Sequence, residues 1–188
     1  FGSNLKETEE KVIGLEARRQ RLVAETTGAE PEFGGPLLSS RPDLVAGELA
    51  QLIARRQGLR SKLAAHDQRS SQREQEIREN SSKIRSLEEG LKLAEEEREL
   101  TASMVSEGVA AKVEVIRLYA RLSELKGGLD AARLAGPRLD AALAEARSAR
   151  AEEEAIASAE AHKELSAVEV ELAALRQSME GSADKVAR

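Results

Sequence analysis

Hydrophobic residues along most of this chain recur at alternating steps of three and four, which is the spacing of a heptad repeat. The longest uninterrupted frame runs from Leu49 to Ala94, and further stretches run from Leu5 to Leu22 and from Val115 to Ala146. From Leu165 onward the spacing resumes in a shifted frame. The pattern predicts three helices, over about residues 4–27, 43–105 and 111–180.

Proline and glycine separate the predicted helices. Residues 28–42 hold three of the four prolines and predict a loop, with Asp43 as the N-cap of the second helix. Residues 106–110 form a much shorter break, which requires the second and third helices to run antiparallel. We therefore expect an all-α fold in which residues 1–188 form a single helical domain. Its core is a long antiparallel coiled-coil hairpin with the additional N-terminal helix packed near the base.

The middle of the second helix carries polar residues at seam positions, among them Ser70, Arg73 and Asn80. Such residues weaken a two-stranded seam but can fix its register. They can equally mark a flank that meets a neighbouring copy, and the sequence leaves both interpretations open. A seam that is one residue thick also predicts no room for a small-molecule pocket.

Composition supports long helices and argues against several functions. Aromatic residues make up 2% of the 188 residues, whereas charged residues make up 34%. The 29 basic and 34 acidic residues are interleaved and give a net charge of −5, which argues against nucleic acid as a partner. Cysteine is absent, and His66 and His162 are the only histidines, so we expect no metal centre and no cofactor. Since no catalytic motif is present, the sequence predicts a protein that is not an enzyme.

The first residues, Phe1, Gly2 and Ser3, lack a start methionine, and no apolar run is long enough to cross a membrane. The chain is therefore expected to be a fragment of a larger protein.

Two segments resemble a known family. Residues 104–118, from Met104 through Gly108 and Lys112 to Leu118, resemble the helix–turn–helix tip of periplasmic adaptor proteins. The run Arg21-Leu-Val-Ala-Glu25, followed by the loop 28–42, is similar to the "RLxAE" segment and Pro/Gly loop of the HlyD-type branch, the membrane fusion proteins of type I secretion. The order and spacing of these segments extend the resemblance over essentially the whole chain.

The resemblance implies a structural adaptor in the periplasm, anchored to the inner membrane by a segment absent from this chain. Such adaptors link an inner-membrane ABC exporter, through domains also absent here, to a TolC-type outer-membrane channel that docks at the hairpin tip. Full-length copies are expected to form a ring, with six as the expected number. Two alternatives remain open: the hairpin of a multidrug-efflux adaptor, or a coiled-coil scaffold of the cytoplasm.

The resemblance places the partner-binding site at the hairpin tip. The adaptor motif Arg-x3-Leu-x6-Ser/Thr, aligned on Gly108, falls on Leu100, Met104 and Ala111, so only its middle apolar position is kept. Its arginine and hydroxyl contacts do not carry over to this chain. The candidate site residues are Ser103, Met104, Val105, Glu107, Gly108, Val109, Ala111 and Lys112.

Overall fold

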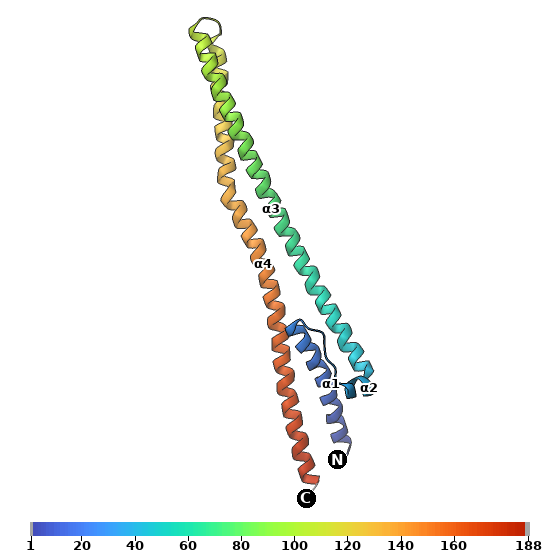
Figure 1. The fold of residues 1–188 in the computed structure, drawn as a ribbon. Helices are drawn as coiled ribbons and strands as arrows, with labels where there is room; N and C mark the ends of the chain where they lie inside the picture. Colours follow the sequence, from blue (N-terminus) through green and yellow to red (C-terminus); the bar gives the residue numbers. More distant parts are fainter. Residues whose placement is uncertain (1, 187–188) are drawn as a thin grey trace. The chain divides into compact units, whose positions relative to one another are not determined.

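The structure, a computed structural model, describes residues 2–186 and contains four helices (Figure 1). They are α1 (Gly2–Thr27), α2 (Gly35–Ser40), α3 (Pro42–Ser106) and α4 (Lys112–Val186). Within the described residues no strand occurs, and the predicted all-α hairpin with an additional N-terminal helix is confirmed. The chain forms two compact units, to both of which α3 and α4 contribute. Unit 1 comprises the residues up to 65 and from 150 onward, and unit 2 comprises residues 66–149.

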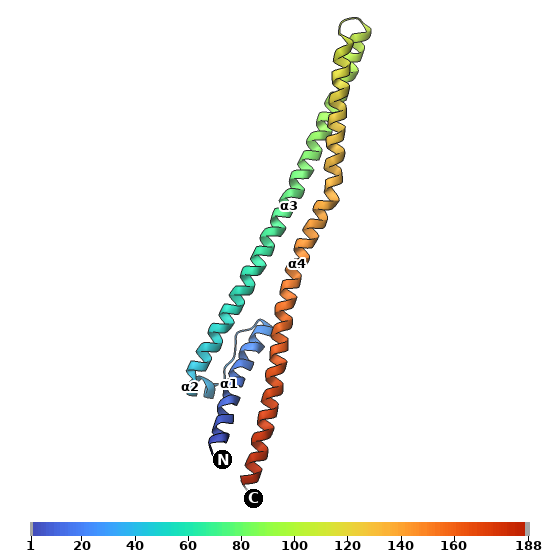
Figure 2. The ribbon, with the colours of Figure 1, turned by 180° about the vertical axis from the view of Figure 1, so that it is seen from behind.

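Unit 1 is a three-helix assembly in which α1 lies beside the C-terminal part of α4, as Figures 1 and 2 both show. The seam residue Leu22 of α1 is fully buried against Val168 and Leu172 of α4. Val45 and Leu52 from the start of α3 are also buried. Helices in proteins owe most of their stability to packing of an apolar face, so the stability of α1 comes from this packing.

Unit 2 contains only α3 and α4, packed as an antiparallel pair. Small side chains let the two helices approach closely: a Cβ added at Gly128 would lie 3.5 Å from Leu87, and one at Gly90 would lie 3.7 Å from Leu125. Only a few side chains of this unit are fully buried. Its buried hydrophobic residues are Ala94, Leu118, Leu122, Leu129 and Ala132.

The polar seam residues of α3 do not all lie where the heptad frame places them. The Nδ2 atom of Asn80 donates a hydrogen bond to the backbone oxygen of Ala132 at 2.9 Å, which fixes the register of α3 against α4. The placement of Arg73 in the seam is wrong, because Arg73 is exposed and pairs with Glu76 on its own helix. Its neighbour Glu74 is half-buried instead and binds Arg147 of α4 at 2.8 Å.

Three helix boundaries differ from the sequence-based expectation. The segment predicted as a loop over 28–42 contains α2, whose serine hydroxyls bond to carbonyls one turn earlier. Arg41 ends α2 because a residue before proline avoids the helical region, and its φ is −137°. Proline at the first helical position is favourable, so α3 begins at Pro42 and the N-cap role predicted for Asp43 is wrong. The last helix continues to Val186, past the predicted end at residue 180.

Candidate functional site

The connection between α3 and α4 reverses the chain within residues 107–111 (Figure 1). The amide of Val109 donates to the carbonyl of Met104 at 2.9 Å, and the amide of Gly108 donates to that of Val105 at 3.1 Å. This pair of bonds is a Schellman motif, which satisfies the last carbonyls of α3. Gly108 adopts φ +75°, the left-handed conformation that the motif requires.

The candidate site residues at this reversal are mostly exposed. The side chains of Val109 and Met104 are 68% and 37% exposed, whereas that of Val105 is half-buried. The neighbouring Val113, which is not among the candidate residues, is 50% exposed. Ser103, Glu107, Gly108, Ala111 and Lys112 are also exposed. The turn therefore presents apolar side chains to solvent beside one acidic and one basic residue, and the amides of residues 107–110 are bonded to carbonyls of α3.

The residues that align with the adaptor motif lie near this turn but differ in character. Leu100 stands where the motif has arginine and is 65% exposed. The nearby Arg98 is turned toward α4, where its guanidinium lies 5.6 Å from the centre of the Tyr119 ring. Arg98 is therefore held against Tyr119 by a cation–π contact and does not replace the missing motif arginine.

A substitution at the turn tests its backbone geometry. We expect Gly108→Val to destabilise the end of unit 2 by about 2 kcal/mol, because a side chain at positive φ costs about 1–2 kcal/mol and a β-branched one costs more. Hydrogen exchange of the amides in residues 100–118 should accelerate accordingly. Gly127→Val is the matched control, since Gly127 lies within α4 with open space around it and without a positive φ. Equal exchange in the two variants would show that the turn tolerates a side chain.

Unit 1 contains an ionic network that sequence reasoning missed. Arg21 of α1 is fully buried and donates hydrogen bonds to Glu25 on its own helix, at 3.0 Å, and to Glu48 on α3. Arg55 of α3 binds Glu25 of α1 and Glu164 of α4, each at 3.0 Å. These contacts join all three helices of the unit. One sequence feature could have indicated this network: Arg21 and Glu25 are four residues apart, which places opposite charges on one face of a helix.

The pKa of Glu164 reflects this network. Partial burial alone would raise the pKa of its carboxyl, but the hydrogen bonds and charges of Arg55 and then Arg18 outweigh burial and hold the pKa below its ordinary value. Glu164 therefore stays ionised in the folded state, as a link between α4 and the two other helices.

A hollow of about 310 Å³ lies in unit 1, just past the end of α1, and the expectation of no pocket is wrong. The prediction assumed a seam between two helices, whereas three helices meet here and α1 ends beside the hollow. Several charged groups in its lining have partners within the chain: Lys62 binds Glu153 at 2.8 Å, and Arg56 donates to the backbone oxygens of Ala24 and Ala29. Internal contacts therefore hold much of its charged lining, and Glu160 also lies there. Leu59, Ile156 and Ala157 form its apolar part.

The part of the chain that the structure describes brings together no group of three His, Asp or Glu side chains able to hold a metal ion. His162 is exposed, and its Nδ1 atom lies 2.8 Å from the backbone oxygen of Ser158. No helix within residues 2–186 combines the length and the apolar character that a bilayer crossing requires.

Comparison with known proteins places this arrangement of helices in a family. The family described as "AprE, long alpha-helical hairpin" matches residues 1–185. The chain belongs to this family. The sequence-based resemblance to the helical domain of HlyD-type adaptors of type I secretion is thereby confirmed. No curated protein sequence matches this AprE-type hairpin.

Among solved structures, the AprE-type hairpin is similar to the crystal structure of the soluble domain of LipC, a membrane fusion protein of a type I secretion system. The similarity covers 100% of this chain and 91% of that chain, with a TM-score of 0.87 and 14% sequence identity. At this identity the likeness establishes a common fold and transfers no individual residue.

Proposed function

We propose that the AprE-type hairpin is the channel-facing element of a type I secretion adaptor, and that its tip docks against the helical hairpins of a TolC-type outer-membrane channel. Domains outside this chain anchor the adaptor in the inner membrane and bind an ABC exporter. The hairpin then lies in the periplasm, and full-length copies form a ring. The role is structural and requires no catalytic group.

The observation that carries the proposal is the exposed apolar turn. Val109 and Val113 remain solvent-accessible although the amides of Gly108 and Val109 are bonded to carbonyls of α3 and complete the Schellman motif. Glu107 and Lys112 flank them and can supply polar contacts at the edge of an interface. Helical hairpins that meet end to end bury such residues, and burial of each valine contributes about 1.5 kcal/mol or more.

The experiment places a charge in the proposed contact. In the full-length adaptor we expect Val109→Asp to reduce secretion at least tenfold, because an unpaired carboxylate would be buried against the channel. The amount of exporter that co-purifies with the variant adaptor should be unchanged. A photo-crosslinking amino acid at position 109 should form an adduct with the channel in secreting cells.

Val170→Asp is the matched control. Val170 lies on α4 in unit 1 and is 71% exposed, close to the 68% of Val109, so the same charge enters a similar environment away from the turn. We expect this variant to secrete normally. Normal secretion by a well-expressed Val109→Asp variant would refute tip docking.

A further inference from the structure

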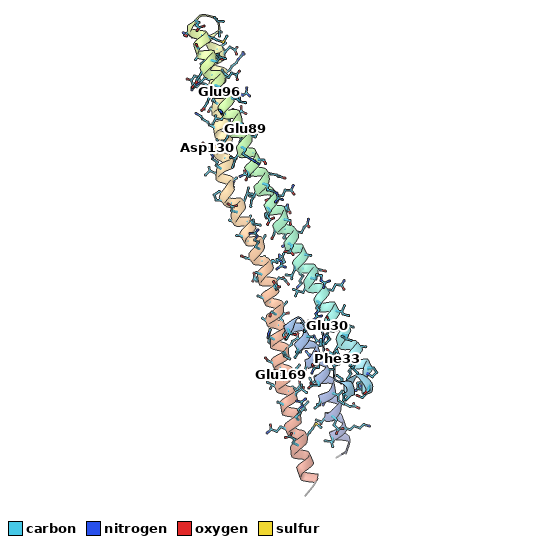
Figure 3. All side chains as sticks on the ribbon, in the orientation of Figure 1. Glu30, Phe33, Glu89, Glu96, Asp130 and Glu169 are labelled. Carbon is cyan, nitrogen blue, oxygen red and sulfur yellow. The ribbon has the colours of Figure 1, made fainter. Side chains whose placement is uncertain are left out.

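The seam of unit 2 is closely packed on the side of the turn. A Cβ added at Gly128 would lie only 3.5 Å from Leu87, so the two helices are in contact at this level. The side chains of residues 66–149 that are fully buried all fall between positions 87 and 132. Asp130, labelled on α4 in Figure 3, lies near the end of this stretch. We call residues 87–132 the tip-side segment.

The seam opens directly after the tip-side segment. Gly136 occupies the seam position that follows Ala132 on α4, and a Cβ added there would meet no atom within 4 Å. Among the described residues of unit 2, none in 66–86 or 133–149 is fully buried. Few buried apolar contacts are typical of a part of a protein that moves at low cost in free energy.

Two causes of helix bending coincide at this point of α4. Pro137 lies inside the helix and has no amide hydrogen, so the carbonyl of Arg133, four residues earlier, loses its helical partner. From across the seam, the Nδ2 atom of Asn80 donates to the carbonyl of Ala132 at 2.9 Å. A proline and a side chain that bonds to the helix backbone both bend helices. Figures 1 and 2 show α4 bending in its light-orange part, just after the tip-side segment.

We propose that residues 132–137 of α4, together with Asn80, form a hinge on which the tip-side segment tilts. The missing amide of Pro137 lets α4 bend there, the open seam at Gly136 leaves room for the movement, and the bond from Asn80 limits it. The facing part of α3 contains no proline, and a continuous helix curves only gently. The local change in angle is therefore absorbed by α4.

The hinge would change the direction of the turn without separating the two helices. The tip-side seam stays packed, and the ion pairs Glu88–Arg133 and Glu74–Arg147 join α3 to α4 on either side of the hinge. Its use, the adjustment of the turn to a channel, rests on the proposed function. The movement itself is measured on the chain without a channel. A failure of the hinge is therefore distinguishable from a failure of docking.

The test measures a distance across the hinge by double electron–electron resonance. The chain has no cysteine, so Ala120→Cys and Ser148→Cys place two nitroxide labels on α4, both at exposed positions of unit 2. The labels are four heptads apart and share one face of the helix, about 42 Å from each other if α4 is straight. A hinge that moves predicts a broad distribution of this distance.

Pro137→Ala should reduce the width of the distribution about twofold, because it restores the amide and removes the clash of the proline ring. The fold should persist, since alanine is the best helix former. Arg138→Ala is the matched control: it changes the exposed neighbour of the proline and should leave the width unchanged. A narrow distribution in the unchanged chain, or equal widths with and without Pro137, would show a fixed bend and overturn the hinge.

Asn80→Ala tests the limiting contact with the same two labels. Loss of the bond to the Ala132 carbonyl should widen the distance distribution by about half. An unchanged width would overturn the role given to Asn80.

Hydrogen exchange provides an independent measurement. In the unchanged chain, the amides of residues 134–141 should exchange about tenfold faster than those of the tip-side segment, and Pro137→Ala should remove most of this difference. Equal protection of the two stretches in the unchanged chain would show that α4 does not open there and would overturn the hinge.

Discussion

Replacement of Arg21 by alanine is expected to lower the free energy of unfolding of unit 1 by about 3–5 kcal/mol, the usual cost of removing one partner from a buried ion pair. Arg21 is fully buried, and its loss would remove the hydrogen bond to Glu48 and leave Glu25 with Arg55 as its remaining partner. Since these bonds join α1 to α3, the first consequence should be release of α1. Hydrogen exchange of the amides in residues 5–27 should then approach the rate of an unprotected chain.

Arg18→Ala is the matched control for this prediction. Arg18 is on the same helix and also contacts Glu164, at 3.4 Å, but its side chain is 46% exposed. An exposed ion pair contributes at most about 1 kcal/mol, so α1 should remain protected in this variant. If the two variants lose similar stability, the buried network is not what holds α1 in place.

The second large effect is expected in unit 2, where Leu122→Ala should cost about 2–5 kcal/mol. The side chain of Leu122 is 4% exposed and lies in a seam that is only two helices wide, so the loss leaves a cavity that no third helix can fill. Chemical unfolding monitored by hydrogen exchange should show the effect in residues 66–149.

Leu134→Ala provides the comparison, because it makes the same chemical change on the same helix. Leu134 is 74% exposed, and its removal should change the stability of unit 2 by no more than about 0.5 kcal/mol. Similar losses in the two variants would show that the seam tolerates cavities, and would contradict the packing described for unit 2.

The heptad spacing was sufficient to predict most of the fold because a coiled coil buries residues according to their position in the repeat. Leu52, Leu122 and Leu129 are buried where the frame places them. Gly108 lies in the short break at residues 106–110 and adopts the positive φ that a tight reversal between two helices usually needs. The role of the turn in binding a partner stays a prediction.

The features that the sequence did not reveal depend on contacts between distant residues. Arg21 precedes a seam residue and would be exposed in a two-helix pair, but it is buried because α1, α3 and α4 meet around it. Glu74 likewise replaces Arg73 at the seam because Arg147 of α4 binds it. The short helix α2 was missed because a Pro- and Gly-rich composition indicates a loop unless the hydroxyl contacts of Ser39 and Ser40 are known.

The repeating ion pairs of unit 2 also determine how such a hairpin can change in length. Glu88–Arg133 and Glu74–Arg147, both 2.8 Å long, are separated by the same two heptads on α3 and on α4. Seven residues added to α3 alone would shift every later pair, whereas seven added to both helices at facing positions would leave each pair intact. Each matched addition would extend the helices by about 10 Å. Hairpins of this type can therefore differ in length by whole heptads while the ion pairs that join their two helices are kept.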